Sequence, residues 1–72
     1  MNIYQRLKSI REDLDKSQEE IARVIGTSQS YYAQYENGKR AIPFERVAAL
    51  AKYYNISLDY IAGFIDTPRK LK

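Results

Sequence analysis

The sequence contains no cysteine and no histidine, and its 3 glycines are scattered. Without cysteine the chain can form neither a disulfide bond nor a thiolate metal site. Without histidine it lacks the usual general base and the usual zinc ligand. The glycines form no phosphate-binding loop, and the acidic residues lie at helix starts or in solvated clusters, where they form no catalytic pair. We therefore expect no enzymatic activity, no cofactor and no bound metal.

Long hydrophobic runs are also missing. The longest apolar stretches are a few residues, whereas a membrane-spanning helix needs about 20. Arg6 and Lys8 near the N-terminus are not followed by the apolar segment that a signal peptide requires. These features predict that the chain has no membrane partner. The lack of cysteine is compatible with a reducing, cytoplasmic setting.

The excess of positive charge is small. There are 12 basic and 9 acidic residues, for a net charge of +3, and this balance permits nucleic-acid binding without requiring it. The distribution of the charges is more informative. Lys39 and Arg40 have no acidic residue within two positions, whereas Glu12, Asp13 and Asp15 cluster near the end of the first helical segment.

Apolar residues recur at helical spacing in five segments, and no segment alternates at the strand period for long. A chain of 72 residues makes one small domain, and amphipathic helices of this kind pack around a single core. We predict an all-α domain over residues 1–65 and a polar tail over 66–72 that should fray. The expected helices span 1–14, 18–25 and 29–37, a fourth has Pro43 as its first residue and is closed by Asn55, and a fifth is capped by Ser57 and runs through Gly63 to Ile65.

Residues 17–40 carry the signals of two helices joined by a tight turn. Ser17 and Glu20 are spaced as a capping box, in which each side chain accepts a hydrogen bond from the backbone of the other. Gly26 can end this helix because glycine adopts the left-handed conformation without steric cost. Ser28, or the threonine before it, can cap the next helix, which should stop at an Asn-Gly pair.

The same stretch carries a longer pattern of small, polar and aromatic residues. Its members are Gln18, Ala22, Gly26, Tyr32, Tyr35, Glu36, Asn37, Gly38, Lys39 and Arg40. In their order and spacing they resemble the helix-turn-helix of the Cro/repressor-type (Xre-like) family of DNA-binding proteins. The resemblance implies a compact, five-helix, lambda-repressor-like domain with its helix-turn-helix unit at residues 17–38. It also implies a sequence-specific transcriptional regulator, a repressor of prokaryotic or phage type, that binds double-stranded DNA in the cytoplasm, associated with the nucleoid.

The second helix of such a unit enters the major groove, where its first residues meet the edges of the bases. A glutamine amide can donate and accept at the same time, which suits adenine, and a serine hydroxyl can bond several bases. A tyrosine can contact a thymine methyl group or reach a phosphate. The candidates for base reading are Gln29, Ser30, Tyr31 and Gln34.

A second set of residues is expected to hold the DNA backbone without reading its sequence. Gln18 lies at a helix start, where free N–H groups attract phosphate, and two hydroxyls lie near the start of the next helix. Asn37, Lys39 and Arg40 match family positions that contact phosphate. The backbone candidates are Gln18, Thr27, Ser28, Asn37, Lys39 and Arg40.

The resemblance implies two contacts within the domain. Arg11 matches an arginine that pairs with the glutamate that here is Glu36, and we expect this ion pair to be structural. It would tie the first helix to the end of the third. Alternatively, the guanidinium edge of Arg11 could contact a phosphate of the DNA. Gln18 matches a position whose side chain braces the residue equivalent to Gln29.

The sequence also gives expectations for the exposure of three polar side chains. Arg6 and most other charged residues of the first helix are expected on a solvated face. Tyr32 and Tyr35 stand where many family members have aliphatic residues. Because a buried tyrosine hydroxyl needs a partner, we expect these rings at the edge of the core with their oxygens in water.

Dimerisation is expected because only Lys39 and Arg40 supply positive charge near the reading helix, so that one copy would bind DNA weakly. Two copies on adjacent half-sites would multiply the contact. The resemblance places the dimer contact in the C-terminal helix, where Tyr60, Phe64 and Ile65 could form the patch; alternatively, these residues close the domain's own core.

A protein-binding regulatory module, such as an antitoxin, is the alternative function. The exposed aromatic residues could serve either function. The two glutamines Gln29 and Gln34, together with Lys39 and Arg40, favour DNA, because a protein interface would prefer apolar anchors at such positions.

Overall fold

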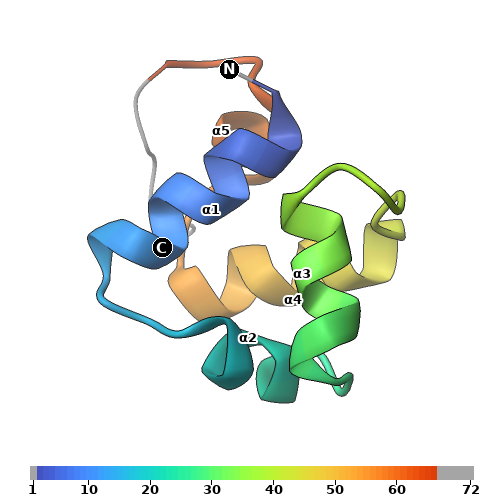
Figure 1. The fold of residues 1–72 in the computed structure, drawn as a ribbon. Coiled ribbons are helices and arrows are strands. Elements are labelled where there is room, and N and C mark those ends of the chain that lie inside the picture. The colour runs from blue at the N-terminus through green and yellow to red at the C-terminus, as the bar shows by residue number, and fades with distance from the viewer. Residues whose placement is uncertain (1, 67–72) are drawn as a thin grey trace.

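The computed structural model describes residues 2–66, and these residues form five α-helices and no strand (Figure 1). The predicted all-α, five-helix fold is therefore confirmed. The predicted polar tail lies outside the described residues except for Asp66. The helices are α1 (Ile3–Asp13), α2 (Gln18–Val24), α3 (Gln29–Glu36), α4 (Phe44–Tyr54) and α5 (Leu58–Ala62).

Side-chain caps fix the starts of four helices. Ser17 and Glu20 form the predicted capping box, with Ser17 Oγ accepting from the Glu20 amide at 3.1 Å. Ser28 and Ser57 cap α3 and α5 in the same way. Asn2 forms a capping box with Gln5 that the sequence reading did not anticipate, so α1 begins at Ile3. Each cap satisfies amide groups that a helix start leaves without an intrahelical acceptor.

Two predicted helix boundaries were wrong. Pro43 has an extended backbone, with φ −66° and ψ 153°, so it is the N-cap of α4 and the helix begins at the next residue. Gly63 has φ 88° and ends α5, where the predicted helix continued to Ile65. At this φ a glycine escapes the steric cost that any residue with a Cβ atom would meet. The C-terminal end of α4 agrees with the prediction, because Asn55 adopts a left-handed conformation with φ 57°.

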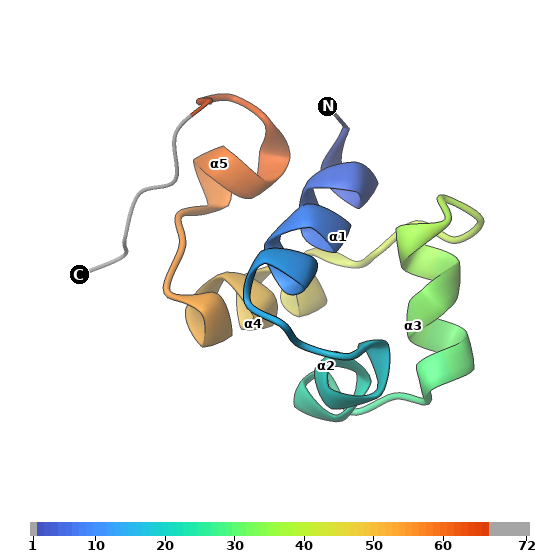
Figure 2. The ribbon, with the colours of Figure 1, turned by 60° about the vertical axis from the view of Figure 1, so that its left-hand side comes forward.

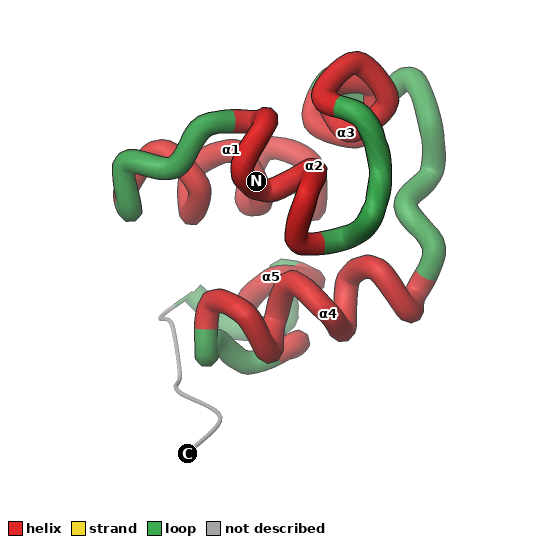
Figure 3. The backbone as a smooth tube through the Cα atoms, turned by 90° about the horizontal axis from the view of Figure 1, so that it is seen from below, coloured by secondary structure: helices red, strands yellow, loops and turns green. Residues whose placement is uncertain are grey.

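The helices pack in two layers around one core. Figure 3 shows α1, α2 and α3 in one layer and α4 and α5 in the other. Ala22, only 1 % exposed, lies in the core between these layers, and its small side chain suits the close approach of α2 and α3. The buried core residues are Leu7, Ile10, Ile21, Ala22, Tyr32, Tyr35, Val47, Leu50, Ala51, Tyr54 and Ile61.

Arg6 is buried, contrary to the expectation of a solvated face. Its guanidinium group lies 4.3 Å from the centre of the Tyr60 ring. The physical reason is that α5 packs against α1, so the Tyr60 ring covers the Arg6 side chain. The apolar periodicity of α1 alone predicts that this side chain faces water.

The arrangement leaves α3 at the edge of the molecule. Figure 2 shows α3 at one side and α5 at the other, with α1 between them. The outer face of α3 is consequently available to a partner. None of the helices in residues 2–66 is both long enough and apolar enough to cross a membrane.

Candidate nucleic-acid interface

The surface of α3 divides into a core side and an outer side. Tyr32 and Tyr35, on the core side, are at most 1 % exposed. Gln29 and Ser30 are exposed at the first turn of the helix, and Gln34 is half-buried. Tyr31, the fourth predicted base-reading residue, is also half-buried, so only the first turn of the helix is fully exposed. The predicted backbone residues flank it: Ser28, Asn37, Lys39 and Arg40 are exposed, and Gln18 and Thr27 are half-buried.

A buried ion pair joins α1 to the end of α3. Arg11 Nε donates to Glu36 Oε2 at 2.7 Å, and Arg11 Nη2 donates to Glu36 Oε1 at 3.0 Å. A third bond runs from Arg11 Nη1 to the carbonyl oxygen of Lys16 at 2.8 Å. The planar guanidinium group makes two parallel hydrogen bonds to the carboxylate, and the single ammonium group of a lysine could not replace this geometry.

The environment of Glu36 keeps its carboxylate charged. Burial alone would raise the pKa of Glu36, but the hydrogen bonds from Arg11 and from the amide of Gln18, together with the proximity of the Tyr32 hydroxyl, outweigh it, so the pKa lies below its ordinary value. The same hydrogen bond to Glu36 raises the pKa of Arg11. Both shifts indicate a permanently charged pair at neutral pH.

The two core tyrosines of α3 place their hydroxyls differently. The expectation of an oxygen in water is wrong for Tyr32, whose hydroxyl is buried beside the Glu36 carboxylate but outside hydrogen-bonding geometry. Burial, followed by the carboxylate, raises the pKa of Tyr32. The hydroxyl of Tyr35 accepts a hydrogen bond from Arg46 Nη1 at 2.8 Å. Both rings are at most 1 % exposed, so neither lies at the edge of the core as expected.

A directional chain of hydrogen bonds leads from Glu36 to the outer surface. A carboxylate can only accept, so the Gln18 amide must present nitrogen to it, and Gln18 Nε2 lies 3.1 Å from Glu36 Oε1. The oxygen of Gln18 then faces Gln29, whose Nε2 donates to it at 2.6 Å. The predicted brace between Gln18 and Gln29 is therefore confirmed. Within residues 2–66 the oxygen and the second N–H of Gln29 have no partner, so they remain for a partner outside the domain.

Gln34 is held through its amide oxygen, whereas Gln29 is held through its amide nitrogen. Arg40 Nε donates to Gln34 Oε1 at 3.2 Å. Because a guanidinium group can only donate, the amide oxygen faces it and the amide N–H groups remain available. Gln29 and Gln34 thus present different hydrogen-bonding groups at the same surface.

Arg46 is a residue at this surface that the sequence reading missed. It lies in the first turn of α4 and reaches the tyrosines of α3. The sequence did contain a signal, because a positive side chain in a first turn opposes the helix dipole. Such a residue calls for a compensating partner or a ligand.

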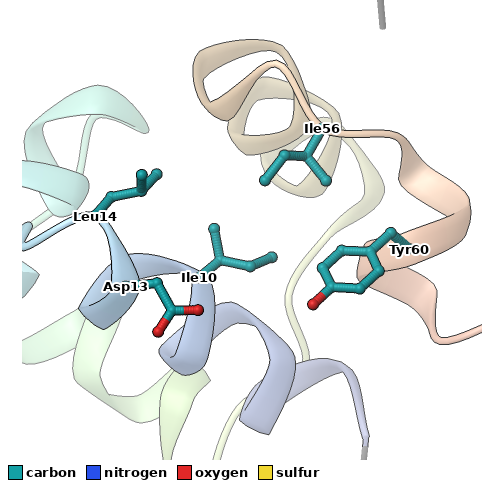
Figure 4. Close-up of a pocket in the computed structure, with 5 residues that line it drawn as sticks. All are labelled: Ile10, Asp13, Leu14, Ile56 and Tyr60. Atoms are coloured by element: carbon teal, nitrogen blue, oxygen red, sulfur yellow. The ribbon is translucent and has the colours of Figure 1, made fainter. Parts of the chain in front are cut away.

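Two residues of the predicted dimer patch line separate grooves, and the third, Ile65, is half-buried and lines neither. Tyr60 borders a groove of about 190 Å³, in which Figure 4 shows its ring opposite Ile10 and Ile56. Phe64, 80 % exposed, borders a separate groove of about 360 Å³ together with Phe44. Within residues 2–66, no group of three acidic side chains is placed to hold a metal ion.

Comparison with known proteins identifies a family model and several relatives that match the chain. A family model described as Helix-turn-helix matches residues 7–61. The chain is 36% identical over 64 residues to an uncharacterized HTH-type transcriptional regulator, YobD, of Bacillus subtilis, covering 89% of this chain and 57% of the relative. It is 34% identical over 62 residues to the cryptic phage CTXphi transcriptional repressor RstR of Vibrio cholerae, covering 86% and 56%. It is also 33% identical over 61 residues to the antitoxin PezA of Streptococcus pneumoniae, covering 85% and 39%.

The fold has a close counterpart among solved structures. The P22 c2 repressor, solved in complex with a synthetic operator, matches with a TM-score of 0.78 and 24% identity, over 88% of this chain and 96% of the repressor chain. The chain spans about half the length of the curated relatives it matches, or less. The family model covers most of the sequence, and its match includes the capped turn, the braced glutamines and the buried ion pair. The chain therefore belongs to the helix-turn-helix family, as the pattern in residues 17–40 predicts.

Proposed function

We propose that this chain binds double-stranded DNA and represses transcription by occupying an operator. In this proposal α3 enters the major groove and its first turn meets the bases. The observation that carries the proposal is the exposed amide of Gln29, held in one orientation by Gln18 at 2.6 Å. A solvated surface glutamine has no need of such a brace, whereas a base-reading side chain benefits from it.

The base-reading surface consists of Gln29, Ser30 and Gln34 at the outer side of α3. Gln29 retains a free oxygen and a free N–H, which together match the N6 and N7 groups of adenine. Gln34 retains donors, which match acceptor groups such as N7 or O6 of guanine. Ser30 adds a hydroxyl that can donate or accept.

The surrounding polar residues position the protein on the phosphates. Lys39 and Arg40 supply positive charge directly after α3, and Asn37 lies next to them. Hydroxyls of Thr27 and Ser28 lie at the opposite end of the helix. Such contacts set affinity and its salt dependence and leave sequence preference to the bases.

The proposed assembly is a homodimer on DNA. A single reading helix with few nearby cations makes a small interface, and a two-fold pair doubles it. The proposed contact is the exposed ring of Phe64 with Ile65 near α5. Phe64 and Phe44 are both exposed beside one groove, and a contiguous exposed apolar patch marks an interaction site. The proposed setting is the cytoplasm of a bacterium, at the nucleoid, and the proposed action is binding without catalysis.

Selection of binders from randomised duplex DNA at about 150 mM salt tests the proposal, since that ionic strength suppresses non-specific phosphate binding. An enriched inverted repeat would support sequence-specific binding by a dimer. A single short motif would support DNA reading and argue against the dimer. Failure to enrich any sequence would contradict the proposed function.

Variants of the surface test the division between reading and positioning. Gln29→Ala and Gln34→Ala should reduce the preference for the selected site over other sequences. Lys39→Ala should weaken binding to all duplexes equally. Equal losses of preference in the glutamine and lysine variants would contradict this division.

A protein-binding regulatory module is the second candidate function. It is supported by the similarity to an antitoxin and by the groove of about 360 Å³ beside two exposed phenylalanines. Capture of a partner protein that is lost on Phe44→Ser, but kept on Gln29→Ala, would favour this alternative. The residues lining the groove are Ile3, Ile42, Phe44, Val47, Leu58, Asp59, Ala62 and Phe64.

A further inference from the structure

Two arginines from different elements converge on the ring of Tyr31. The guanidinium carbon of Arg40, which follows α3, lies 4.5 Å from the ring centre. That of Arg46, on α4, lies 5.7 Å from the same ring and 5.9 Å from the ring of Tyr35. The two tyrosine rings meet edge to face with their centres 5.6 Å apart. Both arginines are therefore oriented by aromatic contacts.

The positive charge of this cluster is not neutralised. Neither Arg40 nor Arg46 forms an ion pair with a carboxylate of residues 2–66. Arg46 also stands in the first turn of α4, where the helix dipole disfavours a cation. Two like charges held near one ring without a counter-ion repel each other, and an anion between or beside them would relieve the repulsion.

The hydrogen bonds of the cluster leave donors for such an anion. Arg46 uses Nη1 for the hydroxyl of Tyr35 at 2.8 Å, and Arg40 uses Nε for Gln34 Oε1 at 3.2 Å. A guanidinium group has five N–H donors, so most donors of both groups have no partner in the part of the chain that the structure describes. The bond to Gln34 places the cluster directly beside the proposed base-reading surface.

The ring of Tyr31 is occupied by these contacts. It is half-buried, and it meets two guanidinium groups and the ring of Tyr35. A ring held in this way is a platform for the arginines and is poorly placed to approach a thymine methyl group. This assignment differs from the base-reading role that the sequence suggested for Tyr31.

We propose that Arg40 and Arg46, stacked on Tyr31, form an arginine clamp for a phosphate of the DNA backbone, and that Tyr31 is a positioning residue. The inference rests on the proposed DNA-binding function and adds to it a backbone contact from α4. The free donors of two guanidinium groups suit the oxygens of a phosphodiester, which they can contact in pairs.

The test measures the salt dependence of binding to the selected site and to a random duplex. If Arg46 neutralises one phosphate, Arg46→Ala should lower the log–log salt slope by about 0.9 on both duplexes. Between 50 and 200 mM salt the variant would then lose about 3-fold less affinity than the parent does. Lys52→Ala is the matched control, because it removes one exposed positive charge from the same helix.

Two tyrosine variants test the positioning role. Tyr31→Phe keeps the ring, so affinity and sequence preference should stay at the parental values. Tyr31→Ala should weaken binding to both duplexes, and adding Arg46→Ala should then cost less than it does alone. A change of base preference in Tyr31→Phe would overturn the positioning role, because only the hydroxyl differs. Unfolding of each variant by urea shows whether it remains folded under the binding conditions.

The outcomes separate the clamp from the function on which it rests. If the parent selects a site but Arg46→Ala and Lys52→Ala have equal slopes, the clamp is wrong and the function stands. If no site is selected but Arg46→Ala alone loses low-salt binding to random duplex, the clamp stands and sequence-specific regulation fails. If the parent binds no duplex at any salt concentration, both fail. An NMR response of the arginine Nε–H groups to inorganic phosphate as large as that to duplex, at equal ionic strength, would overturn the assignment to the DNA backbone.

Discussion

Gln18 and Glu36 are joined by a hydrogen bond from Nε2 to Oε1 of 3.1 Å, and this contact couples the buried ion pair to the exposed amide of Gln29. The bond between Gln18 and Gln29 completes the coupling at 2.6 Å. The orientation of the exposed Gln29 amide thus depends on the buried carboxylate of Glu36.

Gln18→Ala should make the contribution of Gln29 to base preference much smaller, because an unbraced amide can rotate freely. In a double-mutant cycle on the selected DNA site, Gln18→Ala and Gln29→Ala should be non-additive by about 0.5–3 kcal/mol. Gln18→Ala with Gln34→Ala is the control pair, since Gln34 is held by Arg40 instead. Additive losses in both pairs would show that the brace has no effect on reading.

Arg11→Met should lower the free energy of unfolding by about 3–5 kcal/mol, because it leaves the buried carboxylate of Glu36 without its main partner. The side chain of Glu36 is 1 % exposed in the pair. Adding Glu36→Leu should recover much of the loss, since no charge then remains buried. Urea denaturation measures both effects.

The exposed pair of Arg23 and Glu19, at 3.5 Å, provides the comparison for that experiment. Arg23→Ala should change the free energy of unfolding by less than about 1 kcal/mol, because a solvated ion pair contributes little. If Arg11→Met also changed the free energy of unfolding by less than about 1 kcal/mol, the buried pair would not be needed for stability.

Stability should fall in acid as Glu36 becomes protonated. The pKa of Glu36 is lower in the folded chain than its ordinary value of 4.5, so the folded state binds a proton less readily than the unfolded state. The stabilisation is therefore fully present above about pH 5 and is lost as the pH falls through the folded-state pKa. The measurement is the urea midpoint between pH 7 and pH 3.

Glu36→Gln serves as the control for the pH series, because it cannot titrate. It should be less stable than the parent at pH 7 and should show a shallower fall in acid. Parallel pH curves for the two proteins would assign the acid effect to other carboxylates.

Tyr54→Phe should raise the free energy of unfolding by about 1 kcal/mol. The Tyr54 hydroxyl is buried and has no hydrogen-bond partner among residues 2–66, and burial raises the pKa of this residue. Removing an unsatisfied polar group relieves its desolvation cost. Tyr35→Phe is the matched change, and it should not stabilise the domain because the Tyr35 hydroxyl accepts from Arg46. Destabilisation by Tyr54→Phe would refute the account.

Much of this fold was predictable because its signals are local. The capping box at Ser17 and the left-handed position at Asn55 depend on neighbouring residues only, and both were predicted. The brace between Gln18 and Gln29 was predictable from the family pattern. The end of α5 at Gly63 was missed because the apolar spacing continues beyond it, and a glycine within an apolar stripe can either interrupt or tolerate a helix.

The features that the sequence did not indicate depend on contacts between distant elements. Arg6 is covered by a ring from α5, and Arg46 reaches tyrosines of α3. The burial of the Tyr32 hydroxyl follows from the close packing around Glu36. Periodicity shows which side of a helix is apolar, but it does not show which polar side chain a neighbouring helix will cover.

The fixed direction of the hydrogen bonds that run outward from Glu36 limits how the surface at Gln29 can evolve. Because the oxygen of Gln18 faces this position, the position accommodates long side chains whose tips can donate, such as lysine or arginine. A glutamate there would place an acceptor against an acceptor and should weaken the contact. New binding preferences at this position should therefore arise along a restricted set of substitutions, and the restriction originates from a carboxylate that never touches the partner.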